Sequence, residues 1–209
     1  MVGRGQGRDH SPAGMDGEKR PYPGSEAMVS RTLSTMGRTV LLGEPPAPVA
    51  EWLERRRALG QDLFDEVWEG EHHVAPAAHA RHGDIDDQVA ALLRPRAGSR
   101  GLWPTGPVNI GWPDDYRVPD RAYLHRRELA TFLPTAAIVV EIVSPGDESY
   151  AKFGFYFASG VQEVLILDPE RRSVEWYGRG AEEFERRGGS ELLDLPEVDL
   201  AADIDWPPS

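Results

Sequence analysis

A carboxylate inside an apolar strand is the feature that most constrains how this chain can fold. Residues 137–143 read AIVVEIV, and every side chain in this run except Glu141 is apolar. A short continuous apolar run of this kind predicts a strand that is covered on both faces. A lone carboxylate in such a strand is costly unless something pairs with it. The sequence therefore predicts a charged partner for Glu141, and a metal ion is one candidate.

An acid and a lysine near this strand extend the pattern. Asp120 lies in a strand predicted over 117–124, and Lys152 lies about one turn into a helix predicted over 147–159. Lys152 is one of only two lysines among 23 Lys and Arg residues, and lysine can give up its proton where arginine cannot. Two carboxylates and a backbone carbonyl suffice for Mg²⁺, which polarises phosphate oxygens, while a lysine positions water. This combination indicates phosphodiester hydrolysis.

The remaining patterns predict an α/β fold with a central mixed sheet whose faces are covered by helices. Three helices are expected, and the second of them is expected to stop at Pro95. A hairpin is expected around a Glu69-Gly70 turn. The expected helices are 48–59, 82–93 and 147–159, and the expected strands include 39–42, 102–103, 108–110, 117–124, 137–143, 163–168 and 173–178.

Composition divides the chain into three segments. Residues 1–35 are rich in Gly, Arg, Ser and Pro without an apolar period, which predicts a disordered extension. Residues 36–195 are expected to form the folded domain, and Met36 is the preferred alternative start. Residues 196–209 are acidic and contain proline, and we expect a loosely held tail.

Charge and residue types exclude several classes of protein. The chain has no cysteine, which excludes disulfides and thiolate metal sites. It shows neither a signal peptide nor a run of 18 apolar residues, so we expect a soluble cytoplasmic protein without a membrane span. The formal net charge of −12 argues against a basic nucleic-acid coat. Clusters of arginine, as at 55–57, are then better explained as solvated faces than as phosphate contacts.

Three stretches in series resemble a known family. They are FDEVWEGEHHVAPAAHARHGDIDDQVAALL (64–93), VPDRAYL (118–124) and AAIVVEIVSPGDESYAKFGFYFASGVQEVLILDPE (136–170). Together they resemble the Uma-two family, a bacterial endonuclease group of the PD-(D/E)XK restriction-endonuclease-like superfamily. The resemblance spans about residues 62–178 and implies a metal-dependent endonuclease with a restriction-endonuclease-like core.

The resemblance also implies roles for individual residues. Asp120 and Glu141 match the two acids of the superfamily motif, and Lys152 matches a catalytic lysine that has moved to the following helix. The superfamily's usual lysine position is occupied here by Val143. The implied cofactor is Mg²⁺ or Mn²⁺, and the implied substrate is nucleic acid, with DNA expected. The implied metal ligands are Asp120, Glu141, the carbonyl of Ile142 and Glu66 as an additional acid, and His82 matches a histidine that opens a helix in the family.

Alternatives remain open at this point. Lys152 alone would be an ordinary solvated helix residue, and His82 is better explained as a helix cap or core histidine than as a metal ligand. Ser144 has no companion histidine in sequence, so it is expected to be a turn hydroxyl. A catalytically inactive nuclease-fold module for nucleic-acid or protein binding is the main alternative function, and a hydrolase of small phosphate esters is another. A homodimer is possible on this sequence.

Overall fold

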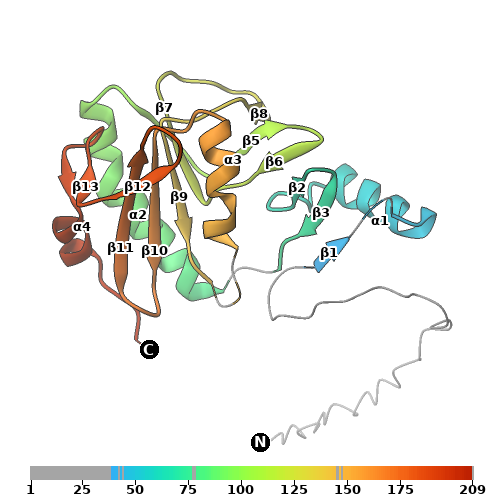
Figure 1. The fold of residues 1–209 in the computed structure, drawn as a ribbon. Helices are drawn as coiled ribbons and strands as arrows, with labels where there is room; N and C mark the ends of the chain where they lie inside the picture. The colour runs from blue at the N-terminus through green and yellow to red at the C-terminus, as the bar shows by residue number, and fades with distance from the viewer. Residues whose placement is uncertain are drawn as a thin grey trace, which may run out of the picture. The chain divides into compact units, whose positions relative to one another are not determined.

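The computed structural model describes residues 39–41, 43, 45–76, 79–144, 146 and 148–208 (Figure 1). All of these belong to one compact unit, Thr32–Ser209. The extension predicted over 1–35 and the alternative start at Met36 lie outside the described residues. No helix in the described part of the chain is long and apolar enough to cross a membrane.

A six-stranded mixed sheet forms the centre of the fold, as the sequence predicts. Its strand order is β12-β11-β10-β9-β7-β4, in which β9 and β10 are parallel and the other neighbours are antiparallel. The strands are β4 (Trp103–Thr105), β7 (Arg121–Leu124), β9 (Ile138–Ile142), β10 (Glu163–Asp168), β11 (Ser173–Arg179) and β12 (Phe184–Arg187).

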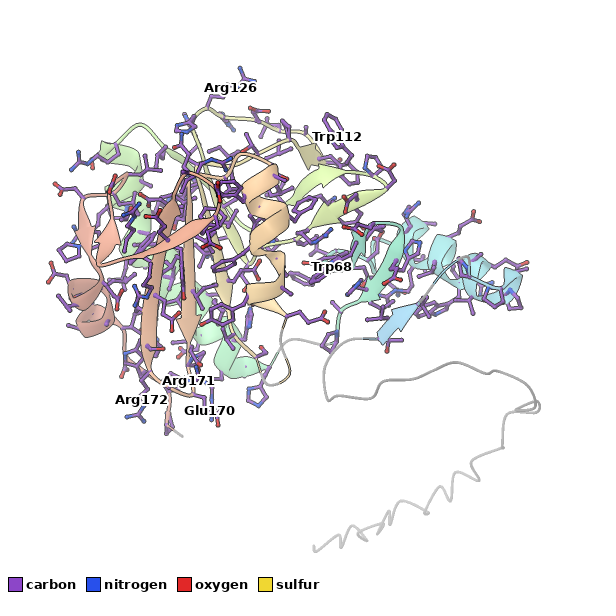
Figure 2. All side chains as sticks on the ribbon, in the orientation of Figure 1. Trp68, Trp112, Arg126, Glu170, Arg171 and Arg172 are labelled. Atoms are coloured by element: carbon purple, nitrogen blue, oxygen red, sulfur yellow. The ribbon has the colours of Figure 1, made fainter. Side chains whose placement is uncertain are left out.

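Helices cover both faces of this sheet, and side chains fill the space between them (Figures 1 and 2). On one face, Ile138, Val140 and Ile142 of β9 share a core cluster with residues of α2 (Ala80–Ser99) and α4 (Glu197–Asp203). On the other face, Val139 shares a cluster with Tyr156 of α3 (Phe153–Ala158). Because side chains alternate along a strand, Glu141 lies on the same face as Val139, toward α3.

A second six-stranded sheet has the order β1-β3-β2-β6-β5-β8. The predicted Glu69-Gly70 turn joins β2 to β3, and both turn residues have positive φ, 50° and 88°. Gly111 in β5 must be glycine, because its φ is 120° and a Cβ would collide with the backbone carbonyl of Asp115. The strands are β1 (Thr39–Leu41), β2 (Glu66–Trp68), β3 (Glu71–Val74), β5 (Asn109–Trp112), β6 (Asp115–Arg117) and β8 (Phe132–Leu133), and the helix before β2 is α1 (Ala47–Ala58).

The strand predicted over 117–124 is two strands in two sheets. β6 ends at Arg117 and β7 begins at Arg121, so residues 118–120 carry the chain from the second sheet to the central one. Pro119 has no N–H to donate to a strand ladder, which explains the break. Asp120 therefore lies in the crossing segment, directly before β7.

Pro95 does not stop the second predicted helix. α2 continues to Ser99 with Pro95 inside it. Val89, Leu93 and Ala97 are all fully buried, so the apolar stripe with a spacing of four continues past the proline. Burial of that stripe against the central sheet offsets the loss of the helical hydrogen bond that Pro95, which has no N–H, cannot donate.

The helix predicted over 147–159 begins as a 3₁₀ turn, η1 (Ser149–Lys152), and continues as α3. Its predicted first residue, Asp147, lies outside the described residues. Gly160 follows it with φ of 83°, as expected for the residue that ends a helix.

The C-terminal segment is not loosely held. α4 buries Leu200 and, just after the helix, Ile204, both in the core cluster shared with α2. The backbone of Asp205 also exchanges two hydrogen bonds with the side chain of Gln88 in α2. The prediction rested on the acidic composition and overlooked the spacing of four between Leu200 and Ile204. These two side chains pack the segment into the core.

Candidate active site

Lys152 joins two buried carboxylates from different sheets. Its Nζ lies 2.8 Å from Oε2 of Glu141 and 3.0 Å from Oε1 of Glu66. The three side chains are at most 4% exposed. Glu141 comes from β9 of the central sheet and Glu66 begins β2 of the second sheet. The structure thus brings three predicted site residues together, and the predicted charged partner of Glu141 is Lys152.

Two further donors serve Glu141. The hydroxyl of Tyr156 donates to Oε1, and the hydroxyl of Ser149 lies 3.5 Å from Oε2. Tyr156 follows Lys152 by four residues, and residues at this spacing share a helix face, so η1 and α3 present both to β9. These donors and the ammonium together explain how the strand tolerates a carboxylate.

Glu66 is held by neutral donors as well as by Lys152. Its Oε1 accepts a hydrogen bond from the backbone N–H of Val118 at 2.9 Å, and its Oε2 accepts from the indole of Trp68 at 2.6 Å. Trp68, which is labelled in Figure 2, in turn stacks on His73 with ring centroids 4.3 Å apart. Glu66 therefore fixes Lys152 to the segment that crosses between the sheets.

Asp120 lies in a more open part of the site. Its Oδ2 accepts from the backbone N–H of Ile142 at 2.7 Å, and its Oδ1 lies 2.9 Å from Nε2 of His82. Ser144 Oγ lies 3.4 Å from the other ring nitrogen of His82. The side chains of Asp120 and His82 are 19% and 22% exposed, so both reach solvent.

Burial shapes the electrostatics of the centre. Burial raises the pKa of Glu141 from 4.5 to about 8, an effect that Lys152 opposes and the charges of Asp120 and Glu66 increase. Burial also raises the pKa of Tyr156 well above 10, and the neighbouring Glu141 adds to this. The phenol is therefore a permanent donor. Lys152 bridges Glu66 and Glu141, and Asp120 accepts from the backbone N–H of the residue after Glu141, so the three carboxylates lie in one neighbourhood.

The donor set suits a hard divalent cation. Glu66, Asp120 and Glu141 supply only oxygen, and the latter two flank the backbone of Ile142. Mg²⁺ commonly takes one or two carboxylates and completes its shell with water and phosphate oxygens. Within the described ranges, no three His, Asp or Glu side chains are grouped as a complete metal site. Asp120, Glu141 and the carbonyl of Ile142 stay the predicted ligands, and oxygen donors of this kind are those that Mg²⁺ or Mn²⁺ takes.

Sequence reasoning did not assign roles to four residues of this centre. Tyr156 lies in the run FGFYF, where several aromatic residues compete, although its spacing of four from Lys152 was a usable signal. Ser149 reaches Glu141 only through tertiary packing, and the contact of Trp68 with Glu66 depends on side-chain directions within β2. Ser144 was expected to lack a companion histidine, and the structure places His82, 62 positions earlier, beside it.

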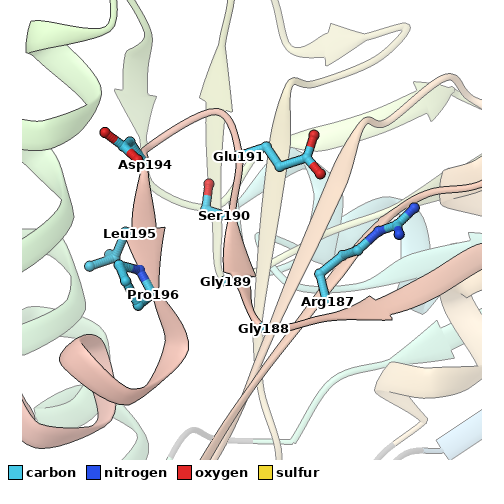
Figure 3. A pocket seen from close by; sticks show the side chains of 8 residues that line it. All are labelled: Arg187, Gly188, Gly189, Ser190, Glu191, Asp194, Leu195 and Pro196. Carbon is cyan, nitrogen blue, oxygen red and sulfur yellow. The ribbon is translucent and has the colours of Figure 1, made fainter.

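A hollow of the described part of the chain lies elsewhere. A cavity of about 360 Å³ is lined by residues 187–191 and 194–196, in and around the β13 (Gly189–Ser190) and β14 (Leu195–Pro196) pair (Figure 3). None of the predicted site residues lines it.

Comparison with known proteins gives a consistent result. The family model Uma2, described as "Putative restriction endonuclease", matches residues 51–206. A solved structure from Anabaena variabilis ATCC 29413, described as "a putative nuclease belonging to DUF820", aligns with a TM-score of 0.51 and 18% identity over 66% of this chain and 90% of that one. A comparison with curated proteins finds no match.

Proposed function

The chain belongs to the Uma2 family, and from this membership and the geometry of its site we propose that it is a metal-dependent endonuclease that cleaves phosphodiester bonds in DNA. The observation that carries the proposal is the buried Glu66–Lys152–Glu141 centre, with Asp120 beside it. Acids and a lysine at these positions are the set that the family resemblance assigns to hydrolysis. The family's description as a restriction endonuclease supports DNA as the substrate.

In this proposal the carboxylates of Asp120 and Glu141, with the carbonyl of Ile142, hold one Mg²⁺ or Mn²⁺ ion. When bound, the ion polarises a phosphate oxygen and lowers the pKa of bound water. Lys152 orients the attacking water and offsets negative charge that develops on the phosphate. Glu66 and Glu141 hold the ammonium of Lys152 in place. In the same proposal, Glu66 contacts the metal through a water molecule.

The test is nicking of supercoiled plasmid with Mg²⁺ or Mn²⁺ by the wild type, Glu141→Gln and Lys152→Met. Glu170→Gln is the matched control, because Glu170 is an exposed carboxylate in the turn after β10 (Figure 2). Metal-dependent nicking that is lost in the first two variants and kept in the control supports the proposal. Thermal melting of each variant separates loss of chemistry from loss of fold.

One observation favours the second candidate, an inactive nuclease-fold module that binds nucleic acid or protein. The ammonium of Lys152 bridges Glu66 and Glu141, so both carboxylates already have a cationic partner within the fold. Wild type that binds neither Mn²⁺ nor Mg²⁺ in calorimetry and cleaves neither DNA nor RNA would favour this candidate. Metal binding that Glu141→Gln abolishes, without cleavage, would instead leave a metal site with another phosphate ester as substrate.

A homodimer and a cytoplasmic location complete the proposal. Four large apolar side chains in and after α1 are at least 43% exposed, which suits an interface with a second copy. These residues are Trp52, Leu59, Leu63 and Phe64. Sedimentation of the purified chain tests the dimer, and a monomer at micromolar concentration would contradict it.

A further inference from the structure

His82 and Asp120 form one half of a two-point contact between α2 and the chain before β7. His82 Nε2 lies 2.9 Å from Asp120 Oδ1. One helical turn later, Asp86 pairs with Arg121, with Nε 2.6 Å from Oδ1 and Nη2 2.8 Å from Oδ2. Two helix residues four positions apart thus hold Asp120, the last residue of the crossing segment, and Arg121, the first residue of β7.

The helix side of this contact is firmly placed. Ile85 and Val89, which flank Asp86 on α2, are fully buried in the core cluster with β9. A side chain in the first turn of a helix anchored in this way has little freedom to follow a moving partner. His82 is therefore suited to impose a position on Asp120, rather than to adapt to it.

Asp120 needs such a constraint. It lies outside regular strand pairing, and the χ2 torsion of an aspartate has a broad energy profile. The backbone N–H of Ile142 engages Oδ2 only, so this one contact leaves the carboxylate free to rotate. A second donor on Oδ1 fixes the plane of the group and orients its remaining lone pairs.

Both ring nitrogens of His82 are engaged. When Nε2 carries the proton that it donates to Asp120, Nδ1 of the neutral ring can accept from the Ser144 hydroxyl at 3.4 Å. The carboxylate of Asp120 is the acceptor that favours the proton on Nε2, and the Ser144 hydroxyl, which can donate or accept, accommodates this tautomer. This arrangement also argues against His82 as a metal ligand, since each nitrogen already faces a protein partner.

We propose that His82 is a positioning residue, which fixes the carboxylate of Asp120 in the orientation that receives the divalent cation. The inference rests on the proposed function, because it assigns Asp120 as a ligand. Outer partners of metal ligands typically change metal affinity or activity by about 10- to 100-fold when they are removed. His82 is predicted to act in this range through Asp120, without touching the substrate.

The experiment measures Mn²⁺ affinity by electron paramagnetic resonance without nucleic acid, and nicking separately. His82→Phe keeps a ring but removes the donor, whereas His82→Gln keeps an N–H near the Nε2 position. We expect Mn²⁺ affinity to fall about 10- to 100-fold in His82→Phe and to stay within about threefold of wild type in His82→Gln. Asp86→Asn is the matched control, because it weakens the other half of the contact and does not touch Asp120.

The outcomes separate the two proposals. Wild type that binds Mn²⁺ with an affinity unchanged by His82→Phe overturns the positioning role and leaves the proposed function intact. Equal weakening in Asp86→Asn and His82→Phe, with no rescue in His82→Gln, also overturns it, because the helix contact as a whole would then be responsible. Absence of Mn²⁺ binding in the wild type overturns both proposals. Melting temperatures of the metal-free variants show whether each one folds.

Discussion

Two buried glutamates at opposite ends of one strand pair illustrate how different partners give similar residues different roles. Glu141 of β9 pairs in register with Ile166 of β10, and Glu163 at the start of β10 pairs with Ile138 of β9. Both carboxylates are at most 6% exposed, and burial raises the pKa of both. Burial and a raised pKa therefore do not distinguish a candidate active site from a structural contact in this molecule.

The donors make the difference. Glu163 accepts hydrogen bonds from the hydroxyl of Ser190 at 2.6 Å and from the backbone N–H groups of Glu191 and Leu192, both at 2.9 Å. These neutral donors close the loop between β13 and β14. Glu141 instead receives an ammonium and a phenol and lies near two other acids. Of the two, only the environment of Glu141 contains charged groups that a phosphate or a cation could bind.

The largest expected effect tests this distinction through activity. Glu141→Gln removes a proposed charged ligand and should lower nicking at least about 100-fold, equivalent to roughly 3 kcal/mol of lost transition-state stabilisation. Glu163→Gln, the same change in the neighbouring strand, should leave the rate within about twofold. Initial nicking rates at saturating Mg²⁺ measure both. Equal losses in the two variants would mean that the site depends on the fold of the sheet as a whole.

The second prediction reverses the comparison and concerns stability. Glu163→Ala leaves two backbone N–H groups and a hydroxyl without their acceptor, and we expect a loss of about 2–4 kcal/mol in the free energy of unfolding. Urea unfolding followed by circular dichroism measures it. Glu191→Ala is the matched control, because its exposed side chain lies in the same loop and its backbone N–H is retained. A loss below about 1 kcal/mol in Glu163→Ala would show that water replaces the carboxylate.

The third prediction concerns pH. The folded pKa of Glu141 is about 8 against an ordinary value of 4.5, so the folded chain holds this proton more tightly than the unfolded chain does. The favourable contribution of this proton to folding stability is complete below pH 4.5 and is lost as pH rises through 8. Unfolding free energies of the metal-free protein should therefore fall over this window, and more steeply in wild type than in Glu141→Gln.

Metal addition gives this prediction its control. A cation that binds ionised Glu141 must displace the proton, so Mn²⁺ binding near pH 7 should release protons in wild type. Calorimetry in two buffers with different ionisation enthalpies measures the release. Identical pH profiles for wild type and Glu141→Gln without metal would show that Glu141 is ionised throughout, with its charge balanced by Lys152.

Much of this centre was predictable because its strongest signals are local. Glu141 interrupts an apolar run, and Lys152 is one of two lysines in the chain, so sequence alone indicated both. The central strands and the Glu69-Gly70 turn follow from apolar runs and turn chemistry. The continuation of α2 through Pro95 could not be predicted in this way, because proline locally signals the end of a helix. Burial of Ala97 beyond the proline outweighs that signal.

Contacts between distant segments were not predictable in the same way. The contact of Ser144 with His82 joins positions 62 residues apart, and that of Trp68 with Glu66 depends on side-chain directions within a short strand. The Ser190 loop that satisfies Glu163 follows it by 27 residues, so no local pattern connects the two. Sequence patterns identified the charged groups, whereas the neutral donors that distinguish their roles required the fold.

The smallest expected effect compares the hydroxyls that serve the two glutamates. Tyr156→Phe removes one donor from Glu141, which keeps Lys152, so we expect a loss of about 1 kcal/mol in unfolding free energy and at most a tenfold slower nicking rate. Ser190→Ala should cost more stability, because the Ser190 hydroxyl also accepts from the backbone N–H of Leu193 at 2.9 Å, which the variant leaves unpaired. Its nicking rate should not change. Parallel urea unfolding and nicking assays measure the two variants. If Tyr156→Phe instead abolishes nicking while it unfolds like wild type, the phenol would contribute to the chemistry itself, and the ammonium alone would not account for what separates Glu141 from Glu163.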